Sequence, residues 1–109
     1  MSKEIDDIFL IKVRDLIRKH PQGAKEVRAI IDFNILGEPG SQWTVDLKKD
    51  FTVKRGYNSQ RDTEVTVTGD NFINLVEGRD SWLVAFGLGK IKVDGDLEPL
   101  LRLKNLFSL

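Results

Sequence analysis

Cysteine is absent from this sequence of 109 residues, and histidine occurs only once, at position 20. Without cysteine the chain has no disulfide framework, no thiolate metal site and no thiol nucleophile, and the absence fits a reducing compartment. A single histidine supplies no second imidazole ligand for zinc. Because His20 ends a helical segment, it is also a poor base for a nucleophilic triad. We therefore expect no catalytic site, no metal site and no cofactor.

An excess of charge of one sign is also missing, because 17 Lys and Arg residues balance 17 Asp and Glu residues. Nucleic-acid binding normally needs a basic excess on one face, so we expect no nucleic-acid partner. No apolar run approaches the roughly 18 residues of a membrane span, and the first residues show no signal-peptide core. These absences predict a soluble, cytoplasmic chain without stable membrane insertion.

The composition that remains is typical of a globular chain, with 40% apolar and 31% charged residues. A length of 109 residues fits one domain, which we expect to span positions 1–109. The sequence contains no internal repeat, low-complexity segment or linker. The fold therefore has to be inferred from the periodicity of its apolar residues.

Apolar residues recur at helical spacing from Ser2, a possible cap, to about Lys19, and again over 72–76 and 82–86. Alternation with period two predicts strands in the remaining segments, at 27–36, 42–48, 51–54, 63–68 and 90–94. Each strand has one polar side, so helices must cover only the other side. We predict an α+β fold: a five-stranded, mainly antiparallel sheet with helices packed on one face.

The closing segment after Asp96 is richer in leucine than a surface helix should be. At 100° per residue its apolar side chains point in nearly every direction, whereas a surface helix shows one stripe. These residues are Leu97, Leu100, Leu101, Leu103, Leu106, Phe107 and Leu109. The pattern indicates either an internal void that holds an apolar ligand or an outer contact with a second subunit.

In order and spacing, the chain resembles the sterol carrier protein 2 family of lipid-binding domains from about Val27 to Phe107. The resemblance is carried by Gly40 with Trp43-Thr44-Val45-Asp46-Leu47-Lys48, Gly56, the strand 63–68, Phe72, Leu75, Gly78, Ala85-Phe86, Gly89-Lys90-Ile91-Lys92-Val93, Gly95 and the leucine-rich closing helix. The chain departs from the family at its end, where Phe107-Ser108-Leu109 replaces a Ser-Lys-Leu type signal, so peroxisomal targeting is not expected.

The resemblance implies that the sheet and helices enclose an apolar tunnel for a fatty acid, an acyl-coenzyme A or a sterol-like molecule. It also implies that the closing helix helps to close that tunnel. The function expected is lipid binding, as a carrier or an accessory lipid-presenting module, without catalysis. The expected ligand-binding residues are Phe33, Ile35, Trp43, Phe72, Leu75, Val76, Trp82, Phe86, Leu97, Leu101, Leu103 and Leu106.

A second hypothesis from a different class stays open. The same apolar closing helix would serve a protein-interaction module whose interior is solid and which forms a homodimer or docks to a partner protein, without lipid. The two hypotheses differ in whether fatty acid changes the behaviour of the protein in solution.

Overall fold

The computed structural model describes residues 2–109, and the predicted cap by the side chain of Ser2 lies outside that description. The helical segments are α1 (Ser2–Asp7), the π-helical η1 (Ile8–Val13), α2 (Arg14–Lys19), α3 (Pro21–Val27), α4 (Gly69–Val76), α5 (Trp82–Gly87) and α6 (Glu98–Phe107). The strands are β1 (Ile30–Leu36), β2 (Ser41–Asp46), β3 (Thr52–Arg55), β4 (Thr63–Thr68) and β5 (Ile91–Gly95).

The first strand begins later than the sequence predicted, because α3 occupies part of the expected strand. Pro21 is at the start of this helix, where a backbone N–H would have no intrahelical acceptor, so the missing N–H of proline costs no hydrogen bond. Arg28 ends α3 in the left-handed conformation, with φ of 55°. Val27 and Ala29 are buried in the core on either side of that turn, so their alternation does not come from a strand.

The five strands form one sheet, as predicted, and their order in the sheet is β3-β2-β1-β4-β5. Three neighbouring pairs are antiparallel, whereas β1 and β4 at the centre run parallel, with Phe33 opposite Val65. The sheet is therefore mainly antiparallel, as expected, but its central pairing joins strands that are far apart in the sequence.

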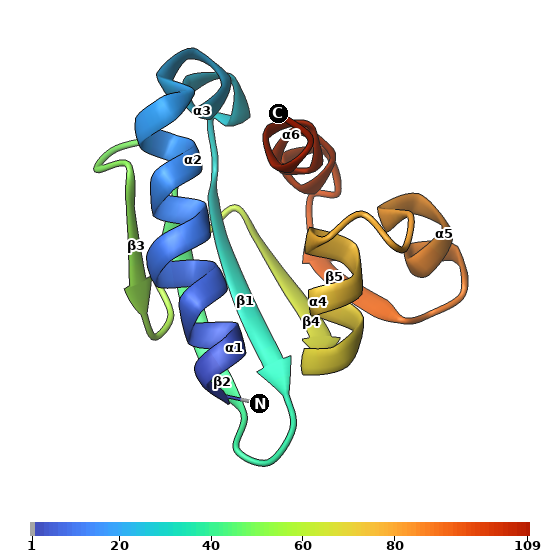
Figure 1. Ribbon diagram of the computed structural model, residues 1–109. Helices are drawn as coiled ribbons and strands as arrows, with labels where there is room; N and C mark the ends of the chain where they lie inside the picture. The colour runs from blue at the N-terminus through green and yellow to red at the C-terminus, as the bar shows by residue number, and fades with distance from the viewer. Residues whose placement is uncertain (1) are drawn as a thin grey trace.

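Helices cover the inner face of the sheet. In Figure 1 the continuous helix α1-η1-α2 and helix α4 lie in front of the strands. The alternating residues Ile31, Phe33 and Ile35 of β1 are buried in the same core as residues of η1, α4 and α6. This arrangement confirms the predicted two layers, with the apolar side of each strand turned toward the helices.

The outer face of the sheet differs from the sequence prediction at its centre. The period-two pattern placed Asp32 on a polar face, yet the side chain of Asp32 is 0% exposed. Its carboxylate accepts hydrogen bonds from Thr44 Oγ1 at 2.6 Å and from the Asn58 N–H at 3.0 Å. Residues between β3 and β4 therefore fold over the outer face and exclude water from this carboxylate.

Helix α6 is more conventional than its composition indicated, and the prediction of all-round apolarity was wrong. Leu100, Leu103 and Leu106 form one buried stripe, while Glu98 and Asn105 lie on the exposed side. Two of the counted leucines fall outside the helix, since Leu97 precedes it and Leu109 follows it. Leu101 and Phe107 flank the stripe and are partly buried.

A carboxylate holds the turn that leads from β2 to β3. Asp46 is 5% exposed, and its Oδ1 accepts the backbone N–H groups of Lys48 and Lys49, each at 2.9 Å. Burial alone raises the pKa of this carboxyl, but the backbone hydrogen bonds outweigh it and hold the pKa below the ordinary 3.8.

We expect Asp46→Ala to lower the free energy of unfolding at pH 7 by about 1–2 kcal/mol, because two N–H groups lose a charged acceptor. Since the folded pKa is depressed, this stabilisation is present above pH 3.8 and is lost as the pH falls through the folded value. Urea titrations at pH 7, 4 and 3 measure the difference between the variant and the parent. The exposed neighbour variant Asp50→Ala is the control. A difference for Asp46→Ala that does not shrink in acid contradicts the assignment.

Candidate functional site

Four aromatic side chains fill the space between the sheet and the N-terminal helix. The ring of Phe9 stacks on Trp43 at a centroid distance of 4.7 Å and on Phe72 at 5.1 Å. It also meets the edge of Phe33 at 5.4 Å, and all four residues are 0% exposed. Three of the predicted ligand-binding residues are thus packed together around Phe9. Phe9 itself is not one of the predicted residues.

A second group of predicted residues lies around a groove of about 450 Å³ between α4, α5 and α6. Leu75, Val76 and Trp82 line this groove, and the ring of Trp82 packs against Phe107 at 5.8 Å. The lysines Lys12 and Lys104 line it as well. The structure therefore brings three predicted residues to a surface opening that the end of α6 borders.

The remaining predicted residues are dispersed. Leu103 and Leu106 lie on the buried side of α6, and Ile35 is buried in the core near the end of β1. Leu97 and Leu101 are partly buried at the beginning of α6. Phe86 is 41% exposed on α5, so its aromatic ring does not share the burial of Trp82 on the same helix.

A pocket of about 700 Å³ lies between α3 and α6. Gly23, Leu106 and Leu109 supply its apolar lining. A Cβ atom on Gly23 would lie 3.1 Å from Cδ1 of Leu109 and 3.4 Å from Cδ1 of Leu106, so glycine lets the two segments approach closely. The volume is within the range of roughly 300–1,000 Å³ that is common for small-molecule sites.

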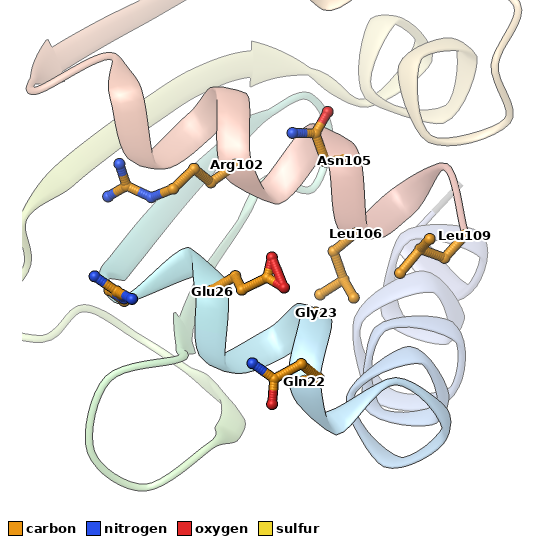
Figure 2. Close-up of a pocket in the computed structure, with 8 residues that line it drawn as sticks. Gln22, Gly23, Glu26, Arg102, Asn105, Leu106 and Leu109 are labelled. Atoms are coloured by element: carbon orange, nitrogen blue, oxygen red, sulfur yellow. The ribbon is translucent and has the colours of Figure 1, made fainter.

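The charged side chains of this pocket are Glu26, Arg28 and Arg102. Figure 2 shows Arg102 at one end, Leu106 and Leu109 at the opposite end, and Glu26 pointing into the space between them. Arg102 Nε donates to the Val27 carbonyl at 2.8 Å and Nη1 lies 3.2 Å from Glu98, which fixes the guanidinium. Two cations and one anion therefore line the pocket beside its apolar end, and Glu98 already pairs with one of the cations, Arg102.

Sequence reasoning missed the two arginines because they are far apart along the chain. Arg28 follows a helix that the strand pattern concealed, and Arg102 is one of two cations, with Lys104, among the leucines of α6. The position of Arg102 inside an apolar segment was the available signal, since a positive side chain there needs a partner. Within residues 2–109, no cluster of three or more His, Asp or Glu side chains is arranged to hold a metal ion. Nor does this part of the chain contain a helix that is both long and apolar enough to cross a bilayer.

Comparisons with known proteins agree with this architecture. Residues 11–108 match the SCP-2 sterol transfer family. A fatty acid-binding protein of Yarrowia lipolytica is 31% identical over 112 residues, which cover 89% of this chain and 87% of that protein. Human hydroxysteroid dehydrogenase-like protein 2 is 34% identical over 86 residues, but the match covers 77% of this chain and only 21% of that protein.

Solved structures share the fold. Apo sterol carrier protein 2 from Yarrowia lipolytica superposes with a TM-score of 0.76 and 29% identity, covering 88% of this chain and 84% of that chain. Palmitated SCP2L2 from Aedes aegypti superposes with a TM-score of 0.77 and 24% identity, covering 94% of each chain. The match over most of the chain, together with this sheet order and helical layer, shows that the chain belongs to the SCP-2 sterol transfer family.

Proposed function

We propose that this chain binds one lipid under α6 and acts as a carrier or an accessory lipid-presenting module, without catalysis of its own. The observation that carries the proposal is the position of α6, which borders a pocket beside α3 and a groove beside α4 and α5. Its leucines Leu103 and Leu106 are buried, and Leu106 also lines the pocket. An apolar chain that ran beneath the helix would contact these leucines and then Leu75, Val76 and Trp82.

The energetics favour a long apolar chain as the ligand. Each buried methylene contributes about 0.8 kcal/mol, so sixteen carbons supply roughly 13 kcal/mol before the costs of association and ordering. The fold relative from Aedes aegypti is described as palmitated, which supports a ligand of this length. Displacing α6 to admit the acyl chain would break apolar contacts of this helix, and contacts with the ligand would then replace them.

The head group is inferred from the charges of the pocket between α3 and α6. Arg28 and Arg102 outnumber Glu26, so an anionic group is favoured over a neutral one. Of the three expected ligand classes, a fatty acid or an acyl-coenzyme A fits this lining better than a sterol-like molecule. The aromatic cluster around Phe9 would then form the floor under the ligand.

Native mass spectrometry of freshly purified protein tests the proposal directly, because a bound lipid would appear as a defined mass increment. A fatty acyl or acyl-coenzyme A increment supports an anionic lipid as the ligand. A sterol increment would retain lipid binding but overturn the anionic head group. Protein that carries no lipid, and that also fails to bind added palmitate, would contradict the proposal.

We expect Arg28→Ala and Arg102→Ala each to weaken palmitate binding about tenfold, because a charge-assisted contact to the carboxylate is worth about 1.4 kcal/mol or more. Binding of hexadecanol, which has the same chain length and no charge, should stay within about twofold. The matched control is Arg18→Ala, which removes an exposed arginine that pairs with Asp15 away from this pocket. An equal loss with palmitate and hexadecanol would show that the arginines act on folding and not on the head group.

The main argument for the rival homodimer module was a closing helix that is apolar on all sides, and α6 does not have that character. Leu100, Leu103 and Leu106 of α6 are buried within the single chain and do not form an open apolar face. Sedimentation with and without fatty acid distinguishes the two, since an obligate dimer indifferent to lipid would favour the rival. The absence of cysteine fits the cytoplasmic location that we propose for the protein.

No activity is inferred for this chain from the dehydrogenase-like relatives. The chain corresponds to about a fifth of their length, so the matching part is one portion of a larger protein. We propose that the shared portion presents lipid and that the catalytic chemistry of such proteins resides elsewhere.

A further inference from the structure

Four of the eight large apolar residues that are exposed in the described chain lie on helix α5 or directly after it. Trp82 and Ala85 face the core at 5% and 2% exposure. The intervening and following side chains point outward: Leu83 is 53% exposed, Val84 59%, Phe86 41% and Leu88 68%. The other large exposed apolar residues, Ile11, Leu36, Tyr57 and Leu109, are far apart in the sequence. A contiguous apolar patch of this kind marks an interaction surface.

Helix α5 lies at the edge of the molecule, beyond α4 and β5 (Figure 1), and contacts β5. Ser81 caps the helix by accepting the Val84 N–H at 3.3 Å, and Gly87 and Gly89 follow it. No atom lies within 4 Å of a Cβ built on either glycine, so the space beyond this turn is open. The outer side of α5 is therefore free to meet a partner.

The charges around this end of the molecule are predominantly positive. Lys12 and Lys104 line the adjoining groove together with Glu77 and Asp80, and neither lysine forms an ion pair with the residues that the structure describes. Nearby, Arg79 pairs with Glu77, and Lys90 lies 4.0 Å from Asp80. The two carboxylates of the groove are thus paired and its two lysines are not, which leaves a net positive charge that suits an anionic surface.

A second copy of the chain fits the patch poorly. A standard protein–protein interface buries about 800 Å² on each partner, which four half-exposed side chains on one short helix cannot supply. A lipid bilayer needs no such area, because apolar side chains enter the boundary of head groups and acyl chains while nearby lysines and arginines contact the anionic head groups.

We propose that α5 is a peripheral docking element that inserts Leu83, Val84, Phe86 and Leu88 into the interfacial layer of an anionic bilayer. The proposal rests on the proposed function, since docking at α5 would bring the groove lined by Leu75, Val76 and Trp82 to the membrane surface. A lipid could then pass between bilayer and protein without crossing bulk water. Docking of this kind is reversible and does not require a membrane-spanning segment.

The absence of cysteine allows a direct test with single-cysteine variants of the full chain. Val84→Cys and Ile11→Cys are each labelled with an environment-sensitive fluorophore, at positions that are 59% and 63% exposed. With vesicles of phosphatidylcholine and phosphatidylserine at 7:3, we expect a blue shift in emission at position 84 and none at position 11. Vesicles of phosphatidylcholine alone should give a much smaller shift at position 84.

Vesicle flotation of the unlabelled protein supplies the second measurement. We expect the double variant Val84→Ser/Leu88→Ser to bind the anionic vesicles about tenfold more weakly than the parent, and Ile11→Ser to match the parent. All these variants should bind palmitate normally in the absence of vesicles, because positions 11, 84 and 88 lie outside the proposed lipid path.

Several results would overturn the assignment to α5: an equal blue shift at positions 11 and 84, an equal loss of flotation in Ile11→Ser, or undiminished flotation in the double variant. Equal binding to neutral vesicles would overturn the anionic preference. Sedimentation as a dimer that Val84→Ser/Leu88→Ser dissociates would assign the patch to a second copy. If α5 fails to dock while palmitate still binds, only this inference falls; if palmitate fails to bind, the proposed function falls.

Discussion

Replacing Phe9 with alanine is expected to lower the free energy of unfolding by about 3–5 kcal/mol, the usual cost of truncating a fully buried aromatic residue. Phe9 contacts the rings of Phe33, Trp43 and Phe72, so its removal takes one member from each of three aromatic pairs. Urea unfolding followed by circular dichroism measures the change, with the slope of the transition checked against that of the parent.

The matched control is Phe86→Ala, which removes the same side chain from a position that is 41% exposed. This change should cost about 1 kcal/mol or less. A cost below about 1.5 kcal/mol for Phe9→Ala would mean that the ring already borders empty space in solution. In that case the ligand cavity would reach the aromatic cluster before any lipid binds.

Asp32→Ala is expected to lower the free energy of unfolding by about 2–3 kcal/mol, because buried hydrogen bonds to a charged acceptor are lost together. The Asn58 N–H would lose its carboxylate acceptor, and Arg61 would lose an ion pair at 3.7 Å. Thr44 Oγ1 would keep a single partner, the Gly56 carbonyl at 2.8 Å. Arg61 is 35% exposed and can be hydrated, which keeps the cost below that of isolating a buried charge.

Chemical denaturation and amide hydrogen exchange measure this effect separately. The loss of stability should be accompanied by faster exchange of the Asn58 amide, because that N–H depends on Asp32. Asp94→Ala is the control, since Asp94 lies on β5 opposite Glu64 and is exposed. If both variants cost the same, the carboxylate of Asp32 is hydrated in solution and the segment between β3 and β4 does not cover it.

The sequence predicted the fold well where apolar periodicity is strong. The alternation in 63–68 and 90–94 corresponds closely to β4 and β5, and the stripe from 5 to 17 corresponds to α1-η1-α2. Boundaries failed where a local backbone conformation decided the structure. The left-handed conformation of Arg28 separates α3 from β1, and nothing in the side-chain pattern around it marks that turn.

The candidate site was predicted less well, because it depends on contacts between distant segments. Leucine spacing alone suggested an all-round apolar α6, but the helix begins only at Glu98, and its buried leucines form one continuous stripe. Arg28 and Arg102 meet at the same pocket only because α3 and α6 are neighbours in the fold. Similarly, Asp32 is buried by the segment between β3 and β4, and no periodicity in the sequence indicates that this segment lies over the sheet.

The parallel pairing of β1 with β4 has a consequence for how the chain folds. The antiparallel pairs β1-β2 and β2-β3 join strands that follow one another, so each closes a short loop. The β1-β4 pair must bring together strands separated by all of β2 and β3, at a larger entropic cost.

A meander of β1, β2 and β3 therefore has the lower kinetic barrier, while the docking of β4 limits the rate of reaching the native state. Strand β5 follows β4 in the chain and in the sheet, and helix α6 follows β5 in the chain, so both become native only after that step. The pocket and the groove beside α6 are accordingly among the last features to form. On a ribosome they would form only after α6 has left the exit tunnel.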